Sequence, residues 1–355
     1  MKRKRINLKP AIKLPKVPFR KSRDVENDDL PRITNDTVAA HREEVLSSAR
    51  KYIYPLQHSK HRVVKISVSL LIAAIIGFFV YFGLALYKFQ STSGFVYAVT
   101  QVIPFPVAKA GSSYVSYNSY LFELRHYIHY YQTQQQVDFS SKSGKEQLAE
   151  FKKRSMNKVL QVAYAKQLAK EHGVSVSNKE VDNEIALVRS QNRLGGSDQV
   201  FRDVLNEFWG WSVTDFRREL RDELLEQKVV TTMDTKTHDK ANDAYAALQS
   251  GADFGETAKK YSEDVSTAPA GGVYPISIDR TNRDIAPQLV SALFVLNQNE
   301  YSPIINTGYR LEIVKVTQIT GDKVQAAHIA VNFKDISYYT DQQQTNTKPR
   351  RFISV

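Results

Sequence analysis

The stretch VQAAHIAVNF, Val324–Phe333, alternates as a half-buried strand does, and the interpretation of the whole chain depends on it. Successive side chains of a strand point to opposite faces of a sheet. One face of this stretch is apolar and is formed by Ala327, Ile329, Val331 and Phe333. His328 falls on the other face between two alanines, which leave room around its ring. The sequence therefore predicts a strand that presents a histidine from a sheet.

The length of 355 residues is enough for two modest domains. The net charge is +12, and residues 1–62 hold 16 Lys and Arg against 7 Asp and Glu. We expect residues 1–62 to form a disordered basic tail. Nucleic-acid binding is disfavoured, because these charges are interleaved with acids and lack the aromatic platforms of single-strand binders. The chain has no cysteine, which excludes disulfides, thiolate catalysis and cysteine metal sites.

An apolar run, VVKISVSLLIAAIIGFFVYFGLALY, covers Val63–Tyr87. Its last 22 residues, Ile66–Tyr87, carry no charge, and this length crosses ~30 Å of hydrocarbon as a helix. We predict one transmembrane helix over 63–88, so the lipid membrane is an expected partner. Basic residues precede the run and only Lys88 follows closely, so the positive-inside rule places the N-terminus in the cytoplasm and the later domains outside.

Beyond the apolar run the composition changes several times. Residues 89–106 are rich in Ser, Thr, Gly and Pro and are expected to be a linker, or a short segment at the lipid surface. Apolar residues at helical spacing and a capping box at Ser177–Glu180 predict an all-α module over 107–235. Residues 236–333 indicate a small α/β domain, and 334–355 a polar C-terminal tail. The predicted fold class is α+β.

Two segments of the α/β part resemble the parvulin family of peptidyl-prolyl isomerases, also called PpiC or rotamase. The first is GADFGETAKKYSEDVSTAPAGG, Gly251–Gly272, and the second is ALFVLNQNEYSPIINTGYRLEIVKV, Ala292–Val316. The helical module is similar to the N-terminal chaperone module of SurA- and PrsA-like exported foldases, in the phrases AKEHGVSVSNKEVD and FRRELRDELLEQKV. The resemblance implies an isomerase domain that follows a chaperone module.

Parvulin-like domains begin with a strand that carries H-I-L, and no such strand precedes Ala241. The stretch at Val324–Phe333 is similar to the absent element. Because the first and last strands of this fold are antiparallel neighbours, a turn at Thr320–Lys323 could join the two as a hairpin. We therefore favour a circularly permuted parvulin domain. The alternative is that this strand starts a second, truncated parvulin domain.

The resemblance also implies a site. His328 matches the histidine of the first strand, and Asp264 matches an acidic position. Arg310 stands where the family has a second histidine, and Thr307 resembles a nearby hydroxyl. Ile285 and Leu289 match the apolar pair that holds the proline ring, the second of which is usually phenylalanine. The departures at Arg310 and Leu289 predict slow catalysis, because an arginine offers only donors and cannot form a histidine pair.

These expectations favour a membrane-anchored extracytoplasmic foldase with weak prolyl isomerase activity on exported, unfolded chains. Isomerisation of an Xaa-Pro bond crosses a barrier near ~20 kcal/mol and needs no cofactor or metal, and the sequence shows no convincing site for either. The alternative is a non-catalytic holdase or scaffold with a degenerate parvulin domain.

Overall fold

The computed structural model describes residues 34–53, 56–191 and 197–355. It divides the chain into two units, Met1–Gly77 and Phe78–Val355. The first 33 residues of the predicted basic tail lie outside the described residues. The rest of that segment departs from the expected disorder, because α1 covers Asn35–Ile53 and α2 already begins at Leu56.

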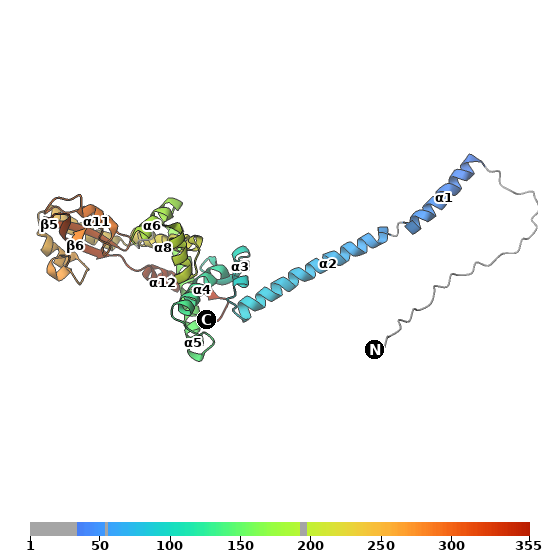
Figure 1. The fold of residues 1–355 in the computed structure, drawn as a ribbon, viewed down its shortest axis with the longest axis horizontal. Helices are drawn as coiled ribbons and strands as arrows, with labels where there is room; N and C mark the ends of the chain where they lie inside the picture. Colours follow the sequence, from blue (N-terminus) through green and yellow to red (C-terminus); the bar gives the residue numbers. More distant parts are fainter. Residues whose placement is uncertain (1–33, 54–55, 192–196) are drawn as a thin grey trace, which may run out of the picture. The chain divides into compact units, whose positions relative to one another are not determined.

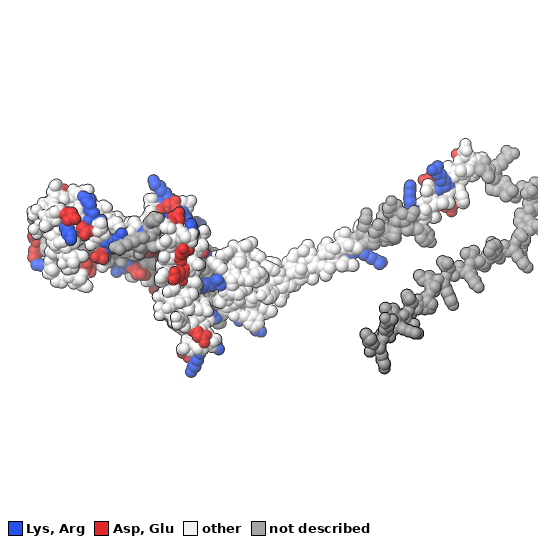
Figure 2. Space-filling model, in the orientation of Figure 1, with Lys and Arg blue, Asp and Glu red and all other residues white. Residues whose placement is uncertain are grey.

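The predicted transmembrane run is helical. Helix α2 spans Leu56–Gly83 and continues into the π-helical turn η1, Leu84–Lys88. In the described part of the chain, one helical stretch, His61–Lys88, has the length and mean hydropathy (2.5) of a membrane span. Figure 2 shows uncharged side chains along the visible face of the middle of α2.

A helical domain follows, and its elements begin inside the segment that we expected to be a linker. Residues 89–106 contain helix α3, Gly94–Val102, capped by the side chain of Ser93. A hairpin of β1, Pro106–Ala110, and β2, Ser113–Ser116, departs from the all-α module that we expected over 107–235. The remaining helices are α4 (Tyr117–Thr133), α5 (Lys142–Glu171), α6 (Asn178–Gln191), α7 (Asp198–Trp209) and α8 (Val213–Met233). The capping box at Ser177 is confirmed, since the side chains and backbones of Ser177 and Glu180 exchange hydrogen bonds.

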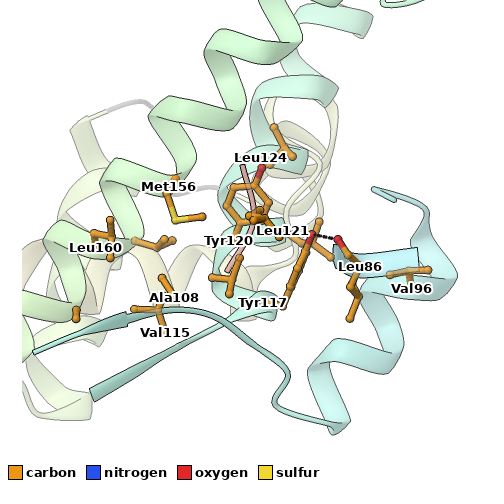
Figure 3. Close-up of a cluster of buried hydrophobic side chains, with 14 of the residues drawn as sticks. Leu86, Val96, Ala108, Val115, Tyr117, Tyr120, Leu121, Leu124, Met156 and Leu160 are labelled. Atoms are coloured by element: carbon orange, nitrogen blue, oxygen red, sulfur yellow. Dashed lines mark hydrogen bonds between the residues drawn. The ribbon is translucent and has the colours of Figure 1, made fainter. Parts of the chain in front are cut away.

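The largest core joins the end of α2 to this helical domain (Figure 3). Leu86 of η1 and Val96 of α3 pack with Tyr117, Tyr120 and Leu124 of α4. The Tyr117 hydroxyl donates a hydrogen bond of 2.5 Å to the Leu86 carbonyl. The apolar helix thus ends inside a folded domain and is not joined to it by a free linker.

The α/β domain contains α9 (Thr235–Gln249), α10 (Phe254–Tyr261), the 3₁₀ turn η2 (Ala268–Ala270) and α11 (Pro287–Leu293). Its strands are β3 (Ile278–Asp279), β4 (Ile305–Asn306), β5 (Arg310–Thr320) and β6 (Lys323–Asn332), in the sheet order β3-β6-β5-β4. Figure 1 shows β5 and β6 side by side with α11 against them. Strand β6, the predicted histidine strand, is therefore an inner strand of this sheet.

The hairpin of β5 and β6 decides between the two interpretations of that strand. The strands are antiparallel, with Leu311 opposite Val331 and Val314 opposite His328. A two-residue turn joins them, in which Gly321 adopts a φ of 62°. Ile329 packs with Ala244 and Leu248 of α9. Because β6 completes this sheet, the structure confirms the permuted arrangement and not the start of a second domain.

The segment 334–355 is more ordered than the polar tail that we expected. Helix α12, Ile336–Asn346, contacts α5 and α8, and Figure 1 shows it beside the helical domain. Strand β7, Arg350–Arg351, pairs with β1. This segment therefore returns from the α/β domain to the helical domain.

Candidate functional site

A cavity of about 380 Å³ opens on the α/β domain. It is lined by all six residues that the sequence singles out: Asp264, Ile285, Leu289, Thr307, Arg310 and His328. These residues come from three loops, a helix and two strands that are distant in the chain. Their convergence follows from the permuted sheet, because β6 brings His328 next to β5.

His328 is the centre of a buried polar network, and the residue is only 2% exposed. Its Nδ1 lies 2.8 Å from Oε2 of Glu312 on β5. Its Nε2 lies 3.0 Å from Oδ2 of Asp264 and 2.8 Å from the Thr267 hydroxyl. The Tyr274 ring stacks on the imidazole with a centroid distance of 4.4 Å. The ring is therefore held on both nitrogens and on one face.

Gly272, the second of the paired glycines in the sequence motif, forms a backbone hydrogen bond with His328. The backbone N–H of His328 donates to the Gly272 carbonyl over 2.8 Å. Gly272 has a φ of 78°, and a Cβ there would lie 2.1 Å from the His328 carbonyl oxygen. Only glycine tolerates this combination of left-handed backbone and close approach. The motif thus explains how the loop after α10 reaches β6.

Arg310 and Glu312 extend the network toward solvent. The structure connects Arg310 to His328 through Glu312. The Arg310 Nε lies 3.2 Å from Oε1 of Glu312, whose side chain is only 2% exposed. A buried carboxylate between a guanidinium and an imidazole is compensated on both sides, as a buried charge requires.

Asp264 stays ionised at neutral pH. Its partial burial acts to raise the pKa, but the hydrogen bonds from the Ser266 hydroxyl and backbone, together with the charge on His328, outweigh burial and lower the pKa to about 2. The Ser266 N–H donates to Oδ1 over 2.9 Å, while Oδ2 faces His328. The carboxylate is therefore a fixed acceptor at the cavity wall.

Apolar side chains also line the cavity. Leu289 lies on α11 and is buried with Ile278 in the core beneath the cavity. Ile285, just before α11, packs against the same core. The Thr307 hydroxyl donates to the Arg310 carbonyl over 3.1 Å, which fixes the approach to β5. The site thus combines apolar side chains with charged and polar groups in one cavity.

Sequence reasoning missed three members of this site: Thr267, Tyr274 and Glu312. The alternation of β5 and β6 was the available signal, since Glu312 and His328 fall on one face of adjacent strands.

No group of His, Asp and Glu within the described ranges has the arrangement of a metal site.

Two protein families match the two domains. Residues 56–230 match the SurA-like N-terminal domain, and residues 224–318 match the PPIC-type PPIase domain, called rotamase. The rotamase match ends before β6, so the strand that carries His328 lies beyond it.

Individual relatives agree with these families. The chain is 28% identical over 198 residues to "Foldase protein PrsA 1" of Lactiplantibacillus plantarum, covering 48% of this chain and 64% of that protein. It is 30% identical over 122 residues to a "Parvulin-like PPIase" of Rickettsia bellii, covering 34% of this chain and 39% of that protein. The chain thus spans less than two thirds of either relative.

Among solved structures, the foldase protein PrsA of Streptococcus pneumoniae aligns with 54% of this chain and 76% of its own, at 19% identity and a TM-score of 0.18. The family matches, which together run from residue 56 to residue 318, carry the assignment. The chain thus contains a SurA-like N-terminal domain followed by a PpiC-type rotamase domain.

Proposed function

We propose that this protein is a membrane-anchored extracytoplasmic foldase that catalyses, slowly, the cis-trans isomerisation of Xaa-Pro bonds in exported, unfolded polypeptides. The observation that carries the proposal is the cavity that Asp264, Arg310 and His328 line together with the apolar Ile285 and Leu289. An Xaa-Pro site needs both surfaces, because the proline ring is apolar and the amide that rotates is polar.

Isomerisation is a rotation about the Xaa-Pro amide bond and breaks no covalent bond. The planar amide is favoured by resonance, and the barrier of ~20 kcal/mol is the loss of that resonance in the twisted state. We propose that Ile285 and Leu289 hold the proline ring while the preceding carbonyl rotates. The Arg310 guanidinium, oriented by Glu312, donates to that carbonyl, and the network of His328 and Asp264 keeps the polar wall rigid. Groups held in place in advance stabilise the twisted state at little further cost.

Turnover of an Xaa-Pro peptide tests the proposal. The full chain is expected to accelerate isomerisation, and Asp264→Asn to lower the rate because it removes the charge that faces His328. Asp243→Asn, an exposed position on α9, is the matched control and should keep the wild-type rate. A wild-type rate equal to the uncatalysed rate would refute the isomerase proposal.

A second cavity, of about 680 Å³, favours the holdase alternative as an additional or separate function. Its lining combines apolar side chains, Val230, Phe333 and Ile336, with charged ones. Tyr309 lines both this cavity and the first, so one extended chain could reach both. Suppression of client aggregation that is unchanged in Asp264→Asn would support chaperone binding that does not depend on catalysis.

The membrane anchor and its orientation are part of the proposal. They are supported by the apolar stretch His61–Lys88 and by the basic residues that precede it. Protease added to intact cells should digest the domains after Lys88 and spare residues 1–62. Protection of the domains would reverse the orientation and refute an exported foldase.

A further inference from the structure

We propose that helix α3 is a second membrane contact, and that its face formed by Phe95, Ala98 and Val102 lies in the outer interface of the bilayer. The inference rests on the proposed membrane anchor and adds to it a lipid-facing surface of the folded domain. The contact would fix how the helical domain sits on the membrane.

The composition of this region is that of an interfacial segment. No charged residue occurs from Phe89 to Ala108. Within α3, Phe95, Ala98 and Val102 are spaced i, i+3 and i+7, so they share one helix face. Phe95 is 64% exposed and Val102 is 83% exposed. A helix that leaves such side chains in water forgoes the stabilisation that their burial would give.

The other face of α3 fixes the helix to the folded domain. Val96 and Thr100 are buried, and Val96 belongs to the core shown in Figure 3. The helix is capped by Ser93 at its first turn. The exposed apolar stripe is therefore held in a defined direction by a packed helix, and its exposure does not come from a loose loop.

This stripe adjoins the end of the apolar helix α2. Phe82 of α2 is 2% exposed and its ring centroid lies 5.9 Å from that of Phe95 and 6.0 Å from that of Phe105. Phe105 also meets Phe79 at 6.4 Å. The exposed side chains of α3 thus continue the apolar surface that α2 presents at its last turns.

The length of α2 that remains free of the domain indicates which partner covers the stripe. The uncharged and largely exposed part of the helix runs from Ile66 to Tyr81, because Phe82 and Leu86 are buried in the core. At ~1.5 Å per residue this part is about 24 Å long, which is less than the ~30 Å of a hydrocarbon core. The hydrocarbon core therefore requires more apolar surface than this part of the helix supplies, and Phe95 of α3 lies beside Phe82 in its last turn.

The groups beside the stripe suit the headgroup layer. Lys88 is the last residue of η1, and Arg125 stacks on the Tyr97 ring at 5.1 Å while it donates to the Thr92 carbonyl. Aromatic rings with a polar end and basic side chains are enriched where membranes meet water. A lipid surface therefore explains the apolar stripe and its basic border together.

Site-specific labelling tests this inference, and the absence of natural cysteine makes single labels clean. The full chain carries Ala98→Cys or Val102→Cys, each labelled with an environment-sensitive fluorophore, in vesicles of phosphatidylcholine and phosphatidylglycerol. Ile72→Cys reports the span, and Val295→Cys, an 80% exposed apolar site on the α/β domain, is the aqueous control. Quenchers are doxyl lipids at shallow and deep positions, and iodide in the water.

We expect the α3 labels to lose fluorescence with the shallow lipid quencher, the Ile72 label with the deep one, and the Val295 label with iodide alone. An Ile72 label quenched deep while both α3 labels respond to iodide would overturn the inference and leave the anchor standing. An Ile72 label that responds to iodide would overturn both. Shielding of the α3 labels from lipid and iodide alike would point to a protein partner and overturn the lipid assignment.

Discussion

The carbonyl oxygen of Gly272 accepts the backbone N–H of His328 over 2.8 Å, which joins the paired-glycine motif to the strand that follows it late in the chain. The glycine motif and the histidine strand belong to one site only because β6 inserts between β3 and β5. The contact therefore connects the permuted order of the strands to the geometry of the cavity.

Replacement of Gly272 tests that contact. Gly272→Ala gives a side chain to a residue with a left-handed backbone, which costs about 1–2 kcal/mol of stability. It also places a Cβ 2.1 Å from the His328 carbonyl oxygen, and this overpacking costs about 1–3 kcal/mol more. Gly251→Ala is the matched control, since its φ of 87° carries the first cost but nothing lies within 4 Å. Chemical denaturation should show the larger loss for Gly272→Ala. Equal losses would mean that the contact with β6 contributes nothing.

Removal of the final strand should unfold the α/β domain. A chain that ends at Thr320 lacks β6 and exposes the partners of Val324, Ile329 and Val331, which are all buried. Each such side chain contributes roughly 1.5–3 kcal/mol, a large share of the ~5–15 kcal/mol of a typical domain. Hydrogen exchange should show loss of protection in α9 and β5. Retained protection there would show that the strand is dispensable.

The buried carboxylate of Glu312 should matter more than an exposed one. Glu312→Gln replaces the carboxylate by an amide and so weakens the ion-pair contacts with His328 and Arg310. The amide N–H is then a buried donor without a well-placed acceptor, which costs about 1–3 kcal/mol of stability. Isomerase activity should fall with it, because Arg310 loses its orienting partner. Glu256→Gln removes an exposed ion pair with Lys259 and should cost much less stability, because solvent screens the pair. Denaturation and peptide turnover of both variants decide the comparison.

The helical domain should lose stability as the pH rises. Burial raises the pKa of Glu123 to about 8, and repulsion from Glu219 adds to this against the opposing charges of Lys158 and Arg218. The native state then holds a proton that the unfolded chain releases near pH 4.3, so the free energy of unfolding falls between about pH 4.3 and pH 8. Glu123→Gln should flatten that decline. The exposed Glu146→Gln should leave it unchanged, and a flat wild-type profile would contradict the prediction.

The sequence was most informative where local signals determine structure. Alternation located β6, and the glycine after Thr320 located its turn. These signals depend on only a few neighbouring residues, so they can be interpreted without knowledge of the fold. All six site residues predicted from the resemblance line one cavity, although their roles stay predictions.

The rest depends on long-range packing. The segment of α3 contains Ser, Thr and Gly and is followed by two prolines, a pattern typical of a linker, and the helix is supported by contacts with α4. Residues 334–355 are polar, and α12 and β7 form against α5 and β1, far earlier in the chain. The burial of Glu312 likewise depends on what covers the sheet, which alternation does not reveal.

Exchange of a proline peptide between its cis and trans forms tests the central claim most directly, that β6 brings His328 into a working isomerase site. Nuclear magnetic resonance exchange spectra would be recorded on an Xaa-Pro peptide in the presence of catalytic amounts of the full chain. Without catalysis, the peptide exchanges between its two forms in about tens to hundreds of seconds. We predict faster exchange with wild type and a rate near background with His328→Gln, at retained near-ultraviolet circular dichroism. Equal rates for the two proteins, or no acceleration by wild type, would contradict the account.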